Sequence, residues 1–145
     1  MKRLMILIGA TFLMLLNFTY LQAQSARNSV YALQTRYLAH MMDSTERATL
    51  IGLLQEYHTK VTMKNEHVLS ERSMWHFFTD DSREFVTITE YSDWSAIEKS
   101  GSRDEELEKQ AWPDAKQRSD FMKKMNGYFS HHKDAIFNGI PKLSK

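Results

Sequence analysis

The sequence contains no cysteine in its 145 residues. This absence excludes disulfide bonds, metal sites built from thiolates, and cysteine nucleophiles. A domain of this size that lacks disulfides has to rest on its hydrophobic core or on a partner subunit. The stability of the chain must therefore come from packing. Any chemical function must come from polar side chains other than cysteine.

An excess of charge of one sign is also missing. The chain has 19 basic and 18 acidic side chains, which gives a formal net charge of +1 at pH 7. Proteins that bind nucleic acid neutralise phosphates with a clustered surplus of lysine and arginine, and this sequence shows no such surplus. We therefore expect no nucleic-acid partner.

The familiar catalytic and metal-binding motifs do not occur. There is no phosphate-binding glycine loop, no nucleophile elbow and no HExxH pair of histidines. His131, His132 and Asp134 are types of metal ligand, but adjacent histidines point about 100° apart on a helix. We therefore expect no metal site.

Residues 1–23 have the pattern of a secretory signal peptide. A basic start at Lys2 and Arg3 precedes the apolar run LMILIGATFLMLL over 4–16, which is shorter than the roughly 20 residues of a membrane-spanning helix. Small Ala23 favours cleavage near residue 23 or 24; the alternative is an uncleaved anchor. We expect a mature domain over 24–145 in the periplasm or outside the cell, with no membrane attachment after cleavage.

The periodicity of the mature chain predicts the order strand, helix, strand, strand, helical region, strand. One amphipathic helix stands out, because apolar side chains recur at three- and four-residue steps and Asp43 and Glu46 have the spacing of a capping box. Ser92 or Asp93 is expected to cap the helix that begins at Trp94. The expected strands lie at 29–39, 73–79, 84–91 and within 134–145; the expected helices lie at 46–62, from 94 to an interruption at 100–106, over 104–111, and from Pro113 to about 131.

This order is the βαββαβ arrangement of ferredoxin-like α+β folds, here with a helical insertion around 101–117. In that fold the helices cover one face of a four-stranded antiparallel sheet. The strands at 73–79 and 84–91 carry apolar bulk on both faces, whereas a sheet with one wet face alternates apolar and polar residues. We therefore expect a homodimer in which two sheets pack face to face.

The segments TEYSDW at 89–94, AWPD at 111–114 and IPKLSK at 140–145, together with the N-terminal segment, resemble small exported proteins of the dimeric α/β-barrel superfamily from Bacteroidetes-type bacteria. The superfamily also includes antibiotic-biosynthesis-type monooxygenases and haem-degrading monooxygenases. The resemblance implies a fold and a homodimer, and it implies no particular activity for the exported branch.

Tyr91 and Trp94 lie where a predicted strand meets a predicted helix, and they allow two interpretations. They can form the lip of a ligand cavity, with their ring faces stacked on an aromatic ligand. Alternatively, Trp94 docks the helix onto the sheet and Tyr91 fills the seam between two subunits, since large aromatics routinely stabilise cores and interfaces. We favour the second interpretation.

His76 is the candidate catalytic residue, because it is flanked by Trp75 and Phe77 in a predicted strand. A neutral imidazole in an apolar cavity can act as a general base or as a haem ligand. No carboxylate is placed beside it by the sequence, so the interpretation that we favour is an interior histidine with a structural role. Trp75, Phe77, Tyr91 and Trp94 are the candidate cavity residues.

Three functions remain open from the sequence. The first is an exported homodimer that binds a small apolar or aromatic ligand in its barrel without a cofactor. The second is a cofactor-independent or haem-handling monooxygenase-like enzyme, in which His76 is the base or the haem ligand and Trp75 and Tyr91 line the cavity. The third is a purely structural or interaction protein.

Overall fold

The computed structural model describes residues 28–143, so the predicted signal peptide at 1–23 lies outside the described residues. The chain divides into two compact units, and Ser29–Asn138 is the one that holds the sheet and the helices. In the other unit, Pro141–Leu143 forms a short 3-10 turn in which the Leu143 N–H donates to the Ile140 carbonyl at 2.9 Å.

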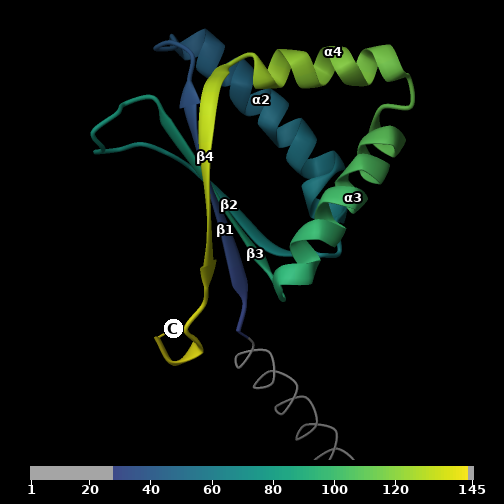
Figure 1. The fold of residues 1–145 in the computed structure, drawn as a ribbon. Helices are drawn as coiled ribbons and strands as arrows, with labels where there is room; N and C mark the ends of the chain where they lie inside the picture. Colours follow the sequence, from purple (N-terminus) through teal and green to yellow (C-terminus); the bar gives the residue numbers. More distant parts are fainter. Residues whose placement is uncertain (1–27, 144–145) are drawn as a thin grey trace, which may run out of the picture. The chain divides into compact units, whose positions relative to one another are not determined.

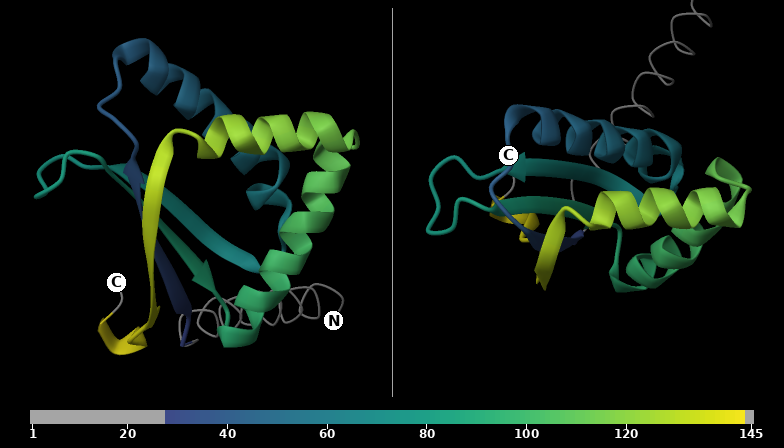
Figure 2. Two further views of the ribbon diagram at one scale, coloured as in Figure 1. Left: turned by 45° about the horizontal axis from the view of Figure 1, so that its top comes forward. Right: turned by 90° about the horizontal axis from the view of Figure 1, so that it is seen from above.

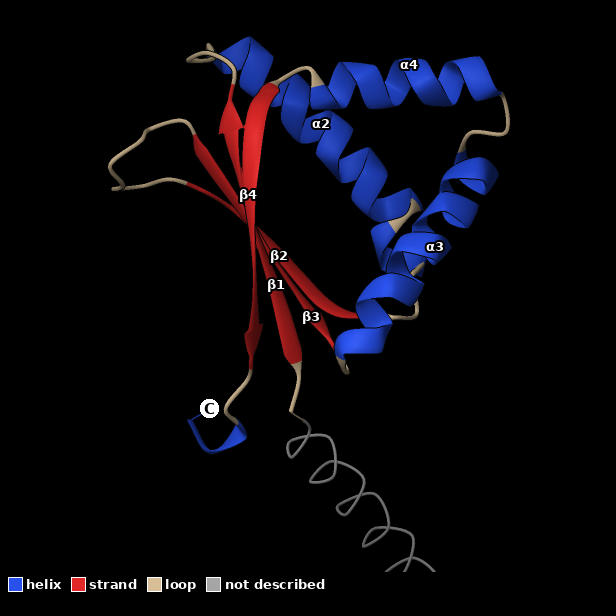
Figure 3. Ribbon diagram, in the orientation of Figure 1, coloured by secondary structure: helices blue, strands red, loops and turns tan. Residues whose placement is uncertain are grey.

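The predicted ferredoxin-like α+β fold is confirmed. The strands form one antiparallel sheet in the order β2-β3-β1-β4, and the helices α2, α3 and α4 all lie on one face of it (Figures 1 and 3). The elements are β1 (Val30–Leu38), α2 (Ser44–Lys60), the 3-10 turn η1 (Thr62–Lys64), β2 (Val68–Trp75), β3 (Glu84–Tyr91), α3 (Trp94–Ala111), α4 (Ala115–Asn126) and β4 (Phe129–Asn138).

The start of α2 is fixed by the capping box that the sequence predicts. The Asp43 carboxylate accepts hydrogen bonds from the backbone N–H groups of Thr45 and Glu46, each at 2.8 Å. Glu46 Oε2 in turn accepts from the Asp43 N–H at 3.2 Å. Asp93 caps α3 in a similar way by accepting from the Ala96 N–H at 3.0 Å. Both caps satisfy backbone donors that the first helical turn leaves free.

The expected strand at 73–79 is wrong in its position. β2 ends at Trp75, and Phe77 and Phe78 lie in the following loop with 99% and 97% of their surface exposed. Pairing with β3 sets this end, since Trp75 is the last residue in register and lies opposite Phe85. The expected strand was placed on the run of aromatic residues, whereas the observed strand ends where its pairing with β3 ends.

The expected interruption at 100–106 is also wrong, because α3 runs without a break from Trp94 to Ala111. A glycine inside a helix costs only about 1 kcal/mol relative to alanine. Around Gly101 that cost is offset by tertiary contacts: Ser100 is buried, and Asn65 Nδ2 donates to its carbonyl at 3.0 Å and to its Oγ at 2.9 Å. Region 101–117 is the second half of α3, a turn and the start of α4.

The last helix and the last strand also differ from expectation. Pro113 precedes α4 rather than starting it, since Asp114 is the cap and accepts from the Gln117 N–H at 2.7 Å. α4 then ends at Asn126, and β4 begins at Phe129. The apolar spacing that suggested a helix up to residue 131 continues from α4 through Tyr128 to Phe129, the first residue of the edge strand β4.

The apolar core lies mainly among the helices. Val61, Leu107 and Trp112 are buried against one another, and Trp112 stacks on Phe121 and Tyr57 with ring centroids 4.3 Å and 6.4 Å apart. The two perspectives of Figure 2 show α3 and α4 as a bent pair that meets α2 away from the sheet. The helices are therefore joined to one another by their largest side chains.

None of the helices between residues 28 and 143 combines the length and the apolar character that crossing a lipid bilayer requires.

We expect Trp112→Ala to lower the free energy of unfolding by about 3–5 kcal/mol, the usual cost of removing a buried aromatic side chain. Trp94→Ala is the matched control, because 67% of the Trp94 surface is exposed. It should change the free energy of unfolding by no more than about 0.5 kcal/mol. Chemical denaturation monitored by circular dichroism measures both, and equal losses in the two variants would contradict this account of the core.

Candidate functional site

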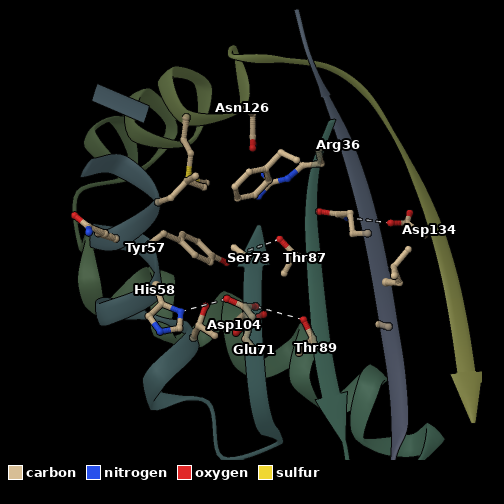
Figure 4. Close-up of a pocket in the computed structure, with 18 of the residues that line it drawn as sticks. Arg36, Tyr57, His58, Glu71, Ser73, Thr87, Thr89, Asp104, Asn126 and Asp134 are labelled. Carbon is tan, nitrogen blue, oxygen red and sulfur yellow. Dashed lines mark hydrogen bonds and ion pairs between the residues drawn. The ribbon is translucent and has the colours of Figure 1, made fainter. Parts of the chain in front are cut away.

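A pocket of about 940 Å³ lies between the sheet and the helices (Figure 4). Its floor is the helix-facing side of the strands, and its wall is the inner side of α2 together with residues of α3 and α4. The side chains that line it include Gln34, Arg36, Tyr57, His58, Glu71, Ser73, Trp75, Phe85, Thr87, Thr89, Tyr91, Asp104, Glu108, Met122, Asn126 and Asp134.

The pocket exists because small and polar residues occupy the middle of the sheet. Register places Gln34 opposite Thr87, and Thr87 opposite Ser73, all on the helix-facing side. Ser73 Oγ and Thr87 Oγ1 lie 3.1 Å apart and form a hydrogen bond with each other. Protein interiors are otherwise packed closely with large apolar side chains. Short polar side chains at these positions leave a space that the helices do not fill.

One end of the pocket is cationic. Arg36 lies in the same row of the sheet as Phe85, and its guanidinium lies 5.4 Å from the Phe85 ring and 4.3 Å from the Phe129 ring. Its Nε is buried and has no hydrogen-bond partner. Burial lowers the pKa of Arg36, and the negative charge of Glu71 opposes that effect only in part.

The opposite end of the pocket is acidic. Figure 4 shows Glu71 pointing toward His58 on one side and toward Thr89 on the other. Glu71 Oε1 lies 3.2 Å from His58 Nδ1, and Glu71 Oε2 accepts from Thr89 Oγ1 at 3.4 Å. A carboxylate at Nδ1 orients the imidazole and leaves its Nε2 as the atom that can exchange a proton.

Three further groups at this end are perturbed by burial. Burial raises the pKa of the Asp104 carboxyl, although Asn65 Nδ2 donates to Asp104 Oδ1 at 2.7 Å and acts in the other direction. Burial also raises the pKa of Tyr57, whose hydroxyl donates to Glu108 Oε1 at 2.9 Å. The pKa of Tyr91 is raised by burial as well. Perturbed groups of this kind gather at functional sites.

The structure brings two of the predicted cavity residues into this pocket. Trp75 lies at the end of β2 and meets Phe85 edge to face, with ring centroids 4.8 Å apart. Tyr91 lies at the end of β3 on the helix-facing side. Phe77 and Trp94 are exposed and do not line the pocket.

The favoured interpretation of Trp94 is therefore wrong. Trp94 does not dock α3 onto the sheet, because most of its surface is exposed at the first turn of the helix. Tyr91 lines the pocket, and its place in a seam between subunits remains a prediction.

His76 does not line the pocket either. It follows the end of β2, and its backbone N–H donates to the Glu84 carbonyl at 3.1 Å. Alternation along the strand turns its side chain away from the side that carries Trp75. Its Nδ1 is buried and has no hydrogen-bond partner. The role of His76 remains a prediction.

Arg36, His58 and Glu71 carry the main polar chemistry of the pocket, and sequence reasoning did not select them. Arg36 interrupts an apolar strand pattern, which was the only local signal. His58 and Glu71 lie on different elements and meet only through the fold. No group of three or more metal-ligating side chains occurs among residues 28–143, and the His132–Asp134 pair is exposed.

The sequence matches no protein-family model and no curated protein sequence. The structure is similar to that of a dimeric protein of unknown function with a ferredoxin-like fold from Bacteroides fragilis NCTC 9343, with a TM-score of 0.52, 6% identity and coverage of 77% of this chain and 96% of that chain. It is also similar to a proposed antibiotic biosynthesis monooxygenase from Caulobacter crescentus CB15, with a TM-score of 0.52, 8% identity and coverage of 79% and 92%. A conserved protein from Methanosarcina mazei Go1 gives a TM-score of 0.50, 7% identity and coverage of 79% and 96%. These likenesses show the fold.

Asp104 generates a prediction for stability against pH. Because the folded protein holds the proton of Asp104 more tightly than the unfolded chain does, stability falls as pH rises from the ordinary aspartate pKa of about 3.9 through the raised folded pKa. Asp104→Asn removes this penalty. The variant should melt above the wild type at pH 7, and the gap should close as the pH is lowered toward 4.

The control for this prediction is Asp80→Asn, which changes an exposed carboxylate in the hairpin loop. It should leave the melting temperature unchanged across the same range. Differential scanning calorimetry at several pH values measures all three proteins, and a pH-independent difference between Asp104→Asn and the wild type would overturn the assignment.

Proposed function

We propose that the protein is an exported homodimer that binds a small apolar or aromatic ligand in the pocket between the sheet and the helices. The observation that carries this proposal is the pocket itself, which joins aromatic surface at Trp75 and Phe85 to a few convergent polar groups. Ligand sites are usually concave and largely apolar, with a small number of polar groups that fix orientation. The predicted signal peptide supports the export part of the proposal.

The homodimer rests on the sheet face that carries no helix. Phe85 and Thr87 point toward the pocket, so the alternation of β3 directs Val86 and Ile88 to the other face. On the flanking strands Met74 and Phe137 belong to this face and are 43% and 54% exposed. Exposed apolar side chains in the middle of a sheet face, with polar residues such as Arg72, Glu84, Glu90 and Lys133 around them, usually mark an interface. The similar B. fragilis protein is dimeric, which supports the same arrangement here.

We expect the mature protein to have twice the chain mass in light scattering. Val86→Lys places a charge at the centre of the helix-free face, beside Thr35 and Met74. It should shift the protein toward monomer, while Met63→Lys, at a position 70% exposed on η1, should leave the dimer intact. A wild type that is monomeric at micromolar concentration would refute this interface.

A second candidate function is a cofactor-independent oxygenase, and the His58–Glu71 pair is the observation that favours it. A histidine held by a carboxylate can take a proton from an acidic carbon or hydroxyl of a bound aromatic. The similarity in fold to the proposed C. crescentus monooxygenase agrees with this alternative. Oxygen uptake with a bound phenolic substrate that is lost in His58→Gln would favour the enzyme over the binding protein.

The haem-handling form of this alternative needs an axial ligand, and the proposed one, His76, does not line the pocket. His58 does line it, and Glu71 at its Nδ1 leaves Nε2 as the atom that could bind iron. We expect no haem cofactor, so addition of haemin should give no specific Soret shift. A Soret shift that is lost in His58→Gln would contradict this expectation.

The binding proposal is tested with the neutral fluorescent probe N-phenyl-1-naphthylamine. The wild type should bind about one probe per subunit with a rise in emission. Thr87→Phe should reduce the affinity by roughly tenfold or more, because the new ring occupies the middle of the pocket. Ala48→Phe adds the same ring at an exposed position of α2 and is the matched control.

Equal binding to the wild type and to Thr87→Phe would show that the probe binds elsewhere and would contradict the proposal. Mass spectrometry of the protein purified from its native host provides an independent measurement, since a small molecule retained by the wild type should be lost from Thr87→Phe.

A further inference from the structure

Arg36 is a half-buried charged side chain that has no anionic partner in the described part of the chain. Between residues 28 and 143 the structure contains no ion pair or hydrogen bond to its guanidinium. Its immediate neighbours are the rings of Phe85 and Phe129, which stabilise a cation only modestly. Removing a charge from water is costly unless the charge is paired, and the ring contacts offset this cost only in part.

The two carboxylates on the same face of the sheet already have other partners. Glu71 is held by His58 and Thr89 at the far end of the pocket. Asp134 accepts a hydrogen bond from Gln34 Nε2 at 3.0 Å. Figure 4 shows this contact of Asp134 between β1 and β4. Neither carboxylate forms an ion pair with Arg36, and the charge of Glu71 offsets the effect of burial only in part, so an anion that enters the pocket meets an unpaired cation.

We propose that the pocket binds an aromatic or apolar monocarboxylate, with its carboxylate paired to Arg36 and its apolar body lying along Trp75 and Phe85. This inference rests on the proposed binding function and specifies its ligand class. The planar guanidinium offers parallel donors that match the two oxygens of a carboxylate. Contact with the Phe85 and Phe129 rings restricts the motion of the guanidinium, which lowers the entropy lost when the ion pair forms.

The acidic groups at the other end limit the charge of the ligand. Glu71, Asp104 and Glu108 line the pocket together with the single arginine that faces them. A dicarboxylate or a phosphate dianion would carry additional negative charge toward these groups, and like charges in a site of low dielectric repel strongly. A ligand with one carboxylate at the Arg36 end and an uncharged remainder avoids this repulsion.

The neighbours of Arg36 also define the shape of the ligand. Trp75, Phe85 and Arg36 lie in one row of the sheet by register, and Met122 and Asn126 of α4 complete this end of the pocket. A flat ring that enters beside Trp75 can lie against these side chains while its carboxylate reaches the guanidinium. Aromatic contacts of this kind contribute beyond simple area burial.

The test compares 2-naphthoate with the uncharged 2-naphthamide by isothermal titration calorimetry at pH 7. The wild-type dimer should bind the carboxylate at least roughly tenfold more tightly than the amide, which is the discrimination expected of one charged hydrogen-bonded pair. Arg36→Met keeps the length of the side chain and removes its charge, so it should bind both compounds with the affinity of the amide.

Two controls separate a specific pair from a general charge effect. Lys109→Met removes one positive charge from an exposed position of α3 and should keep the full preference for the carboxylate. Acetate and inorganic phosphate should bind far more weakly than 2-naphthoate, because they have no apolar body. The melting temperature of Arg36→Met should equal or exceed that of the wild type, since the burial that lowers the pKa of Arg36 no longer opposes folding.

The proposal is overturned if the wild type binds amide and carboxylate equally, or if the preference persists in Arg36→Met. Should that variant fail to fold, the wild-type comparison of the two naphthyl compounds still decides the point. If N-phenyl-1-naphthylamine binds in the pocket but the carboxylate shows no preference, only the ligand class is wrong. If none of the three compounds binds, the proposed function itself fails.

Discussion

The structure depends on the packing of the helices against one another around Trp112. Its ring stacks on Phe121 from α4 and lies near Tyr57 from α2, and the ammonium of Lys60 lies 4.9 Å from the centre of that ring. Aromatic side chains contribute more buried area than other residues, so this contact fixes where the helices meet. Large apolar side chains join the helices here and fill one end of the sheet at Trp75 and Phe85, whereas the middle of the sheet carries polar side chains. The pocket is the space that results.

The overall fold could be predicted from the sequence because it depends on patterns that repeat. The capping box at Asp43, the alternation over 84–91 and the order of the elements all report on local geometry. The end of β2 could not be predicted in the same way. It depends on which residue of β3 lies opposite Trp75, and a run of aromatics does not reveal where a hairpin stops pairing. The continuity of α3 depends on Asn65, which lies far from Gly101 in sequence.

Only part of the candidate site could be predicted from the sequence, because several of its residues meet only in the folded chain. Trp75 and Tyr91 were selected because large aromatics stand out in any strand. Arg36 and His58 were not selected because an arginine in a strand, or a histidine on a helix, is usually exposed to solvent. What distinguishes them is their surroundings: the adjoining rings of Phe85 and Phe129 beside the guanidinium, and Glu71 at Nδ1 of the imidazole. These relations connect strands and helices distant in sequence.

The two faces of β3 link the pocket to the surface that we assign to the dimer. Phe85, Thr87 and Thr89 form part of the pocket floor, and Val86 and Ile88 alternate with them on the other side of the same strand. Adjacent residues of a strand share one backbone, so packing a second sheet against Val86 also restricts the residues on either side of it. A dimer would in this way stiffen the floor on which a ligand rests, and part of the ordering cost of binding would already be met when the subunits associate. The half-buried charge of Arg36 works in the opposite sense, because it has no anionic partner within the described residues and would gain one from the proposed carboxylate ligand. A site with a rigid backbone and an unpaired arginine is suited to select a ligand that carries a negative charge.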